Sequence, residues 1–466
     1  MQDVDYLIIG AGTVGLAFAD MLVQHSNCSI TIVDRNQKPG GHWNFAYDFV
    51  RLHQPSEFYG VESKRLGHAQ RDAAGWNAGY FELASGQEVL DYYDSVMRDQ
   101  LLASGKVTYL PASEYRGNGH VVSLSEGRET LFNVQRKTVD ATYFGTTIPA
   151  GHQPGFSVDD DVNLIAPNDI TTLWKQQPER FDSVCIVGAG KTGMDVGVHL
   201  IELGLSGEQI TWVMPRDSWL MNRTTLQPSA EFFESTMHAQ ALQMQALAEA
   251  SSAKDLFHRM ERSGVMLRLD PDIEPEMYHC AIISEGELEL LRQIGHVVRQ
   301  GRVQHISASG LQLEKSDLKM PSNTLYVDCS ASAVTRHPQI PIYQDGLITP
   351  QIARTCQPAF SAAMIGLIET LDLSDAEKNE LCRPLPLPDT PHEYFSISLS
   401  NMMNQYVWTR TPAIRDWMMQ SRLDGFSGRI AQVTEADASI YTILKTFRHN
   451  MPSAIANIQK LMREPA

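Results

Sequence analysis

Two glycine clusters with the spacing Gly-x-Gly-x-x-Gly are the residues that most clearly indicate a chemical function, the binding of phosphate groups. Each follows a short apolar run and precedes a stretch that we expect to be helical, over 14–24 and 192–203. In such a turn the first glycine permits a sharp bend, the second lets a pyrophosphate approach, and the third lets the helix pack on its strand. The phosphates bind free N–H groups at the helix start. Two copies in this context predict two dinucleotide sites, at Gly10, Gly12 and Gly15 and at Gly188, Gly190 and Gly193.

The residues that follow the two clusters carry opposite charge. Asp34 closes the apolar run after the first cluster, and Arg216 follows the corresponding run after the second. A carboxylate here accepts hydrogen bonds from a ribose 2′-hydroxyl, whereas an arginine suits a 2′-phosphate. We therefore expect FAD at the first site and NADPH at the second. Further candidates for contacts with the cofactors are Arg35, Lys191, Thr192 and Asp328.

The composition limits the classes of function. The 466 residues carry a net charge of -17, with no run of Lys or Arg, which argues against a nucleic-acid partner. No apolar stretch is long enough to cross a bilayer and no leader-like segment opens the chain, so we expect a cytoplasmic protein. The six cysteines lack the CxxC spacing of dithiol flavoenzymes, and we expect six free thiols. No Cys/His cluster predicts a metal site.

The order of elements predicts an α/β fold with two Rossmann-like dinucleotide-binding domains, the NADPH domain being inserted into the FAD domain. Two similar short sequences, at 139–142 and 327–330, predict strands that return to a sheet beside a cofactor. The expected domains are 1–165 for the first part of the FAD domain, 166–323 for the NADPH domain with a helical insertion at about 229–300, 324–372 for the return of the FAD domain, and 373–466 for a mostly helical C-terminal region. A helix within 348–370 either points its positive end at the flavin or is an ordinary buried helix.

A second motif follows Asp34 and carries a family resemblance. Gly40, Gly41, His42 and Trp43 form a GG-x-W segment, which is followed by a polar loop over 51–56. Here the chain resembles the FAD- and NADPH-dependent monooxygenases of the flavin-containing monooxygenase type, with their Baeyer–Villiger and N-hydroxylating relatives. The resemblance implies that Gly41, His42 and Trp43 wrap FAD. It also implies that NADPH reduces the flavin, which forms a C4a-peroxide with molecular oxygen and oxygenates a small molecule.

The polar loop supplies the catalytic candidates. Arg51 could hold the peroxide and NADP+ by its charge, and His53 could move a proton. Gln54 or Asn44 could donate an amide hydrogen bond. The competing interpretations are a surface arginine for Arg51 and a hydrogen-bonded structural histidine for His53.

The chain also departs from this family. The fingerprint Phe-x-Gly-x-x-x-His is absent, because Phe144 and Gly145 are not followed by a histidine in register and His152 has the wrong spacing. The alternatives are a non-oxygenating FAD/NADPH reductase or dehydrogenase, a single-component flavin-dependent halogenase, and a non-catalytic nucleotide sensor. The C-terminal region could cover the substrate pocket or form a homodimer contact, and the sequence does not choose.

Overall fold

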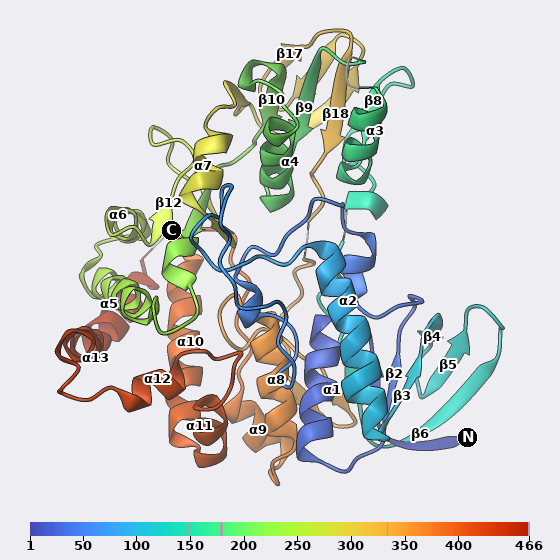
Figure 1. The fold of residues 1–466 in the computed structure, drawn as a ribbon, viewed down its shortest axis with the longest axis vertical. Helices are drawn as coiled ribbons and strands as arrows, with labels where there is room; N and C mark the ends of the chain where they lie inside the picture. Colours follow the sequence, from blue (N-terminus) through green and yellow to red (C-terminus); the bar gives the residue numbers. More distant parts are fainter. Residues whose placement is uncertain (148, 178–179, 333, 465–466) are drawn as a thin grey trace.

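The protein is built from two lobes, each organised around a parallel sheet (Figure 1). The structure, a computed structural model, describes residues 1–147, 149–177, 180–332 and 334–464. The first lobe lies at the bottom of Figure 1 and the second at the top. A layer of helices flanks them on one side. This arrangement confirms the expected α/β fold with two dinucleotide units and a helical C-terminal region.

The first lobe contains the first glycine cluster, between a strand and a helix. Its sheet has the order β19-β20-β6-β1-β2-β3, and β4 and β5 extend it from β6. The strands are β1 (Gln2–Ile9), β2 (Ile30–Val33), β3 (Val107–Leu110), β4 (Ser113–Tyr115), β5 (His120–Ser123), β6 (Glu129–Asp140), β19 (Tyr343–Gln344) and β20 (Leu347–Ile348). β1 pairs in parallel with both β2 and β6, as a β-α-β unit requires.

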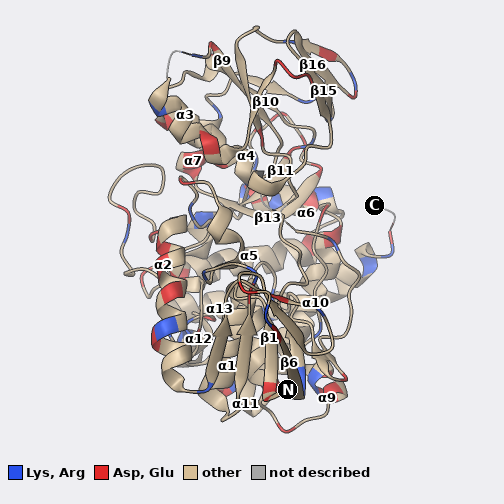
Figure 2. Ribbon diagram, turned by 90° about the vertical axis from the view of Figure 1, so that its right-hand side faces the viewer, with Lys and Arg blue, Asp and Glu red and all other residues tan. Residues whose placement is uncertain are grey.

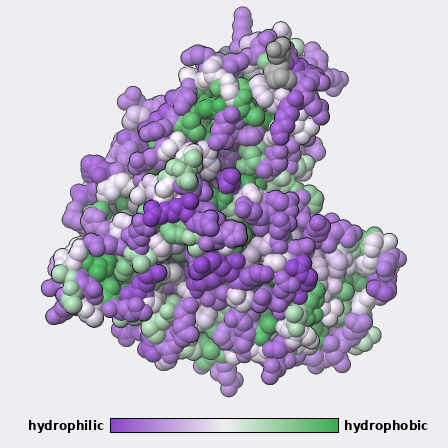
Figure 3. Space-filling model, viewed as in Figure 1, coloured by the Kyte–Doolittle hydropathy of each residue, from purple (hydrophilic) through white to green (hydrophobic). Residues whose placement is uncertain are grey.

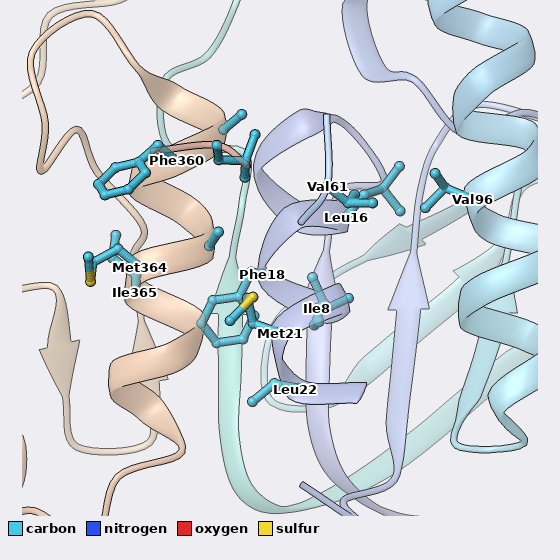
Figure 4. Packing of buried hydrophobic residues seen from close by; sticks show 14 of the residues in the cluster. Ile8, Leu16, Phe18, Met21, Leu22, Val61, Val96, Phe360, Met364 and Ile365 are labelled. Atoms are coloured by element: carbon cyan, nitrogen blue, oxygen red, sulfur yellow. The ribbon is translucent and has the colours of Figure 1, made fainter. Parts of the chain in front are cut away.

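Three helices cover this sheet, namely α1 (Thr13–His25), α2 (Gly86–Val96) and α8 (Pro358–Glu369). Figure 4 shows the side chains that fill the space between α1, α8 and β1, among them Phe18, Met21 and Ile365. The helices approach closely at Gly366, where an added Cβ would lie 2.9 Å from the Cβ of Met21. α8 is thus a buried helix that fixes the position of α1.

The second lobe contains the second glycine cluster. Its parallel sheet has the order β14-β10-β9-β18-β8. The strands are β8 (Asn163–Ile165), β9 (Ser183–Val187), β10 (Ile210–Val213), β14 (His296–Val298) and β18 (Thr324–Asp328), and the helices are α3 (Ile170–Gln176), α4 (Lys191–Glu202) and α7 (Glu285–Leu291). Two small sheets complete the lobe, with β11 (Ser218–Asn222), β12 (Met266–Leu267) and β13 (Met277–Ile283) in one and β7 (Ser157–Val158), β15 (Val303–Ser307), β16 (Gly310–Leu313) and β17 (Asp317–Lys319) in the other.

The strand that we expected to begin the return of the first domain belongs to the second lobe instead. β18 pairs in parallel with β9 and β8, and β7 pairs with β15. The first lobe resumes only at β19 and β20, which join β6. The two similar sequences occupy equivalent positions in the fold. Asp140 ends β6 beside Ile9, and Asp328 ends β18 beside Val187. Each sequence is therefore the end of a strand in its own dinucleotide unit.

The helical layer combines the insertion with the C-terminal region. It contains α5 (Phe233–Glu249), α6 (Ala253–Arg262), α9 (Asp375–Leu381), α10 (Glu393–Arg410), α11 (Pro412–Met418), α12 (Ser427–Gln432) and α13 (Ala438–Leu461). α5 and α13 lie side by side although 188 residues separate Ala250 from Ala438. An aromatic cluster of Phe257, Tyr278 and Tyr394 joins α6, β13 and α10.

A disulfide between Cys280 and Cys356 corrects the expectation of six free thiols. Cys280 lies in β13, and Cys356 lies two residues before α8, so the bond joins the second lobe to the first. The pairing escaped sequence reading because the two residues are 76 apart and share no motif. The other cysteines are buried thiols. Structural disulfides persist mainly in oxidising compartments, so the cytoplasmic location stays a prediction.

The face of the molecule drawn in Figure 3 is mostly hydrophilic, with scattered small apolar patches. Figure 2 shows acidic and basic residues interspersed on the ribbon, including the region where α4, α7 and β11 meet. None of the helices among the described residues is long and apolar enough to cross a membrane. Within the same residues, no group of His, Cys, Asp and Glu has the arrangement of a metal site.

Candidate functional site

The first glycine turn has little space for side chains. Gly10 has φ +101°, in the left-handed region. A Cβ on Gly15 would lie 1.9 Å from the carbonyl oxygen of Gly10, so the close packing of α1 on the turn requires glycine there. α1 begins after Gly12 with no side-chain cap. Its first N–H groups are therefore available to a phosphate.

The GG-x-W segment packs directly on this turn. A Cβ on Gly41 would lie 3.1 Å from the Cα of Gly12, so the two backbones nearly touch. Trp43 is buried and donates from Nε1 to the hydroxyl of Tyr59, at 2.8 Å. His42 is exposed beside it. The segment thus lies against the first glycine turn, and its expected contact with FAD stays a prediction.

A chain of hydroxyl groups fixes the start of α1. Thr13 is 2.6 Å from the hydroxyl of Tyr59 and accepts a hydrogen bond from that of Tyr93, at 2.7 Å. These groups are buried, and each has a partner. Sequence reading missed Thr13, Tyr59 and Tyr93, because Tyr93 is 80 residues from its partner.

Asp34 lies where the ribose of a dinucleotide is expected. It follows β2, is buried, and accepts hydrogen bonds from the N–H groups of Ala11 and Asn36, at 2.5 and 2.7 Å. Burial raises the pKa of this carboxyl although both hydrogen bonds lower it. Arg35 points away, toward Glu114 at 3.7 Å, and is 77% exposed. The carboxylate fits the expected role, whereas Arg35 makes a surface contact.

The three catalytic candidates do not converge on one point. Arg51 is exposed and donates to the carbonyl oxygen of Leu83, at 3.1 Å. Gln54 turns back to the carbonyl oxygen of Phe58, at 3.4 Å. His53 lies 4.0 Å from Asp195 of α4. Desolvation, followed by the charge of Lys191, lowers the pKa of His53 to about 4.

The second glycine turn repeats the geometry of the first. Gly188 has φ +126°, and a Cβ on it would lie 2.4 Å from the carbonyl oxygen of Cys329. A Cβ on Gly193 would lie 2.4 Å from the carbonyl oxygen of Gly188. Gly190 faces open space, and α4 starts after it with no side-chain cap. A phosphate can therefore approach this helix start too. Thr192 lies in the first turn of α4.

Lys191 makes different contacts from those we expected. Its ammonium pairs with Asp195, one turn further along α4, and with Glu287 at 3.0 Å. Residues at i and i+4 share a helix face, which directs Lys191 along α4 rather than toward the glycine turn. Burial lowers the pKa of Lys191, but Asp195 and Glu287 outweigh this and raise it. The expected contact between Lys191 and phosphate is therefore not supported.

Lys191 is part of a buried ionic network of the second lobe, at its contact with the first lobe. Arg223 is fully buried and lies 2.5 Å from Glu287. Burial raises the pKa of Glu287, but Lys191 and Arg223 outweigh this and lower it to about 2. Asp195 accepts a hydrogen bond from Tyr47 of the first lobe, at 2.6 Å. The network consists of Lys191, Asp195, Arg223 and Glu287.

A cleft of about 410 Å³ lies beside this network. Phe49, Arg51 and Trp76 line it from the first lobe, and Lys191, Asp195 and His199 line it from α4. Phe49 stacks on His199 with the ring centroids 3.9 Å apart. The loop that follows the first dinucleotide site therefore meets the helix of the second one.

Arg216 and Asp328 lie at the carboxyl edge of the second sheet. Arg216 reaches both carboxylate oxygens of Asp389, each at 3.3 Å. Asp328 accepts a hydrogen bond from the N–H of Ser330, at 2.9 Å, and so shapes the turn after β18. Asp140 does the same for Thr142 in the first lobe, at 3.0 Å. Binding of a cofactor by Arg216 or Asp328 stays a prediction.

Comparison with known proteins gives the family. Two proteins named only as uncharacterized, Rv2000 of Mycobacterium tuberculosis (strain ATCC 25618 / H37Rv) and Mb2023 of Mycobacterium bovis (strain ATCC BAA-935 / AF2122/97), are each 39% identical over 460 residues. The match covers 99% of this chain and 84% of each relative. The chain belongs to the same family as these mycobacterial proteins. In this member, residues 8–53 also match the family model described as an NAD(P)-binding Rossmann-like domain.

Solved structures confirm the fold of this family member. A polycyclic ketone monooxygenase from the thermophilic fungus Thermothelomyces thermophila is similar with a TM-score of 0.51 and 13% identity, over 96% of this chain and 88% of that one. A second similar structure is that of OTEMO, solved in complex with FAD and NADP. Its TM-score is 0.50 and its identity is 12%, over 79% of this chain and 83% of that one. The expected resemblance to flavin monooxygenases is therefore confirmed for the fold.

Proposed function

We propose that the protein is a FAD-containing, NADPH-dependent monooxygenase that oxygenates a small molecule. The observation that carries this is the pair of glycine turns, each at the start of an uncapped helix in its own parallel sheet. The shared fold with OTEMO, which was crystallised with FAD and NADP, supports the same pair of cofactors. The contact of the 47–53 loop with α4 brings the two units together.

The residues of the first turn fit FAD. The N-terminus of α1 would hold the pyrophosphate, Asp34 the ribose, and Gly41 with Trp43 the wall beside them. When bound there, FAD would supply the group that accepts a hydride from the nicotinamide and makes molecular oxygen reactive. The buried hydroxyl chain of Thr13, Tyr59 and Tyr93 keeps this wall in place without adding charge.

The residues of the second turn fit a phosphorylated nicotinamide coenzyme. Gly190 leaves the N-terminus of α4 open to a pyrophosphate, and Arg216 lies at the strand end that faces the adenosine ribose in such units. Lys191 instead ties α4 to α7 through Glu287. We assign it a positioning role.

The side chains of the polar loop have separable roles. His53 is neutral near pH 7 because its pKa is about 4, so it serves as a hydrogen-bonding group and not as a cation. Arg51 lines the interlobe cleft and is the candidate for an exposed positive charge there. The aromatic rings of Phe49 and Trp76 line part of the cleft, beside charged groups such as Lys191 and Asp195.

Isotope labelling tests the oxygenation. The FAD-loaded protein is mixed with NADPH, ¹⁸O₂ and, in separate reactions, a thioether, a tertiary amine and a cyclic ketone. We expect one labelled oxygen atom in the product per NADPH consumed. Reduction of the flavin by NADPH, with all oxygen recovered as hydrogen peroxide in every reaction, would overturn the proposal in favour of an oxidoreductase that transfers no oxygen.

The non-oxygenating alternative has one specific observation in its favour, namely the absent Phe-x-Gly-x-x-x-His fingerprint. It shares both cofactors and differs only in the fate of oxygen, so the same experiment decides it. The halogenase alternative needs a lysine that guides hypohalite, and Lys191 is paired with two carboxylates.

A further inference from the structure

A compact charge cluster lies where the second lobe meets the chain between α9 and α10. Its centre is Asp389, in the Pro-rich segment 383–391. His279 of β13 lies 2.7 Å from Oδ1 of Asp389, and Arg336 lies 3.4 Å from the same oxygen. Arg216 reaches both oxygens at 3.3 Å. Two guanidinium groups and one imidazole thus surround one carboxylate.

The two guanidinium groups outnumber the carboxylate of Asp389 that they share, and the cluster is open to solvent. The hydrogen bond from His279, followed by the hydrogen bond and charge of Arg216, lowers the pKa of Asp389 to about 2 although burial opposes this. The side chains of Arg216 and Asp389 are 31% and 30% exposed, and those of His279 and Arg336 are more exposed. A solvent-borne anion can therefore reach the guanidinium groups.

The position of the cluster connects it to the second dinucleotide unit. Arg216 follows β10, which pairs in parallel with β9, and β9 leads directly into the glycine turn at Gly188. In open parallel sheets, ligands bind at this carboxyl edge. The cluster thus lies on the side of the sheet where the adenosine of a dinucleotide is expected.

We propose that Arg216, His279 and Arg336 form the subsite for the 2′-phosphate of NADPH, and that the carboxylate of Asp389 occupies this subsite in the free protein. The inference rests on the NADPH site of the proposed function. A phosphate monoester carries about −1.5 to −2 charges at pH 7, more than a carboxylate, and offers three acceptor oxygens. It therefore displaces Asp389 from Arg216, and Asp389 lowers the affinity for the coenzyme by competing with it.

The displacement needs no movement of the backbone. The carbonyl oxygen of Asp389 accepts a hydrogen bond from the N–H of Tyr278, at 2.9 Å, and its own N–H donates to Glu393, at 2.6 Å. Arg336 also holds the carbonyl oxygen of Pro388, at 2.8 Å. These contacts keep segment 383–391 on β13, so only the side chain of Asp389 has to turn away.

Calorimetric binding of two nucleotides tests the inference without any turnover. The full-length FAD-loaded protein is titrated with 2′,5′-ADP, which carries the 2′-phosphate, and with 5′-AMP, which lacks it. We expect Asp389→Asn to tighten binding of 2′,5′-ADP about fivefold, because the part-exposed ion pair with Arg216 no longer has to be broken. Binding of 5′-AMP should not change. Arg336→Gln should weaken binding of 2′,5′-ADP alone.

Asp389→Glu is the conservative control, because a longer carboxylate still competes and should restore the weaker binding. The thermal unfolding curve of each variant shows whether it is folded. If Asp389→Asn leaves the ratio of the two affinities unchanged, or weakens binding of 2′,5′-ADP, the inference is wrong while the NADPH site stands. If neither nucleotide binds to the unaltered protein, the NADPH site falls and the inference with it. Failure to oxygenate a substrate would affect neither result.

Discussion

The two glycine turns have the same backbone geometry but opposite surroundings. At the first, Thr13 lies in a buried chain of neutral hydroxyl groups with Tyr59 and Tyr93. At the second, the equivalent start of α4 carries Lys191, within a network of four ionised side chains. A neutral, fully partnered wall suits a group that stays bound. A charged network at a lobe interface makes the second site sensitive to both charge and lobe position.

The largest effect should come from breaking the charged network. Glu287→Ala leaves Lys191 and Arg223 buried without their shared carboxylate, which should lower the free energy of unfolding by about 3–5 kcal/mol. Urea denaturation followed by tryptophan fluorescence measures the loss. The matched control is Glu208→Ala, which removes an 81% exposed carboxylate paired with His296. A loss as small as that of the control would show that the network does not stabilise the fold.

Acid should destabilise the surroundings of the two glycine turns to different extents. The folded-state pKa of Glu287 is depressed to about 2, so its contribution to stability is present above the unfolded pKa and is lost as the pH falls through the folded one. With an unfolded pKa of about 4.3, this amounts to about 3 kcal/mol between pH 5 and 2. Asp34 acts in the opposite direction, because its pKa is raised. Hydrogen exchange at pH 3 should therefore show α4 and α7 losing protection before α1. The reverse order would contradict the proposed difference between the charged and the neutral glycine turn.

A smaller effect should follow from opening the neutral chain. Tyr59→Phe removes the hydroxyl that accepts from Trp43 and contacts Thr13. Leaving buried polar groups unpaired costs about 1–3 kcal/mol. We expect faster loss of FAD on dialysis with NADPH binding unchanged. Tyr441→Phe, whose hydroxyl makes a surface contact with Glu435, is the control. Unaltered FAD retention would show that the chain does not support the first site.

The smallest expected effect concerns the coenzyme. Arg216→Ala should raise the Michaelis constant for NADPH about tenfold, equivalent to about 1.4 kcal/mol, and that for NADH much less. Initial rates of flavin reduction with the two coenzymes measure it. Equal losses with both would remove Arg216 from the 2′-phosphate subsite.

The local features of the fold were predictable from the sequence. The glycine turns, α1 and α4 follow from short-range rules, because a strand-turn-helix unit needs glycine where the backbone bends or touches itself. The contact of Lys191 with Asp195 was also within reach, as an i,i+4 pair.

Pairings between distant residues were not predictable from the sequence. Glu287 lies 96 residues from Lys191 and Asp389 lies 173 from Arg216, and no local pattern records either contact. The return of the first lobe was placed too early for a related reason. The sequence at the end of a strand beside a dinucleotide is similar in both units. The pairing of β18 with β9 was therefore needed to assign Asp328 to a sheet.

The disulfide adds a mechanical constraint to this plan. Cys280 and Cys356 hold β13 and the chain before α8 together with their Cα atoms 6.0 Å apart. The bond keeps β13 beside the chain before α8, so any opening of the lobes would have to leave these two segments together. Both cysteines are partly exposed, so a thiol reductant could reach the bond and remove this one restraint while the other contacts between the lobes remain.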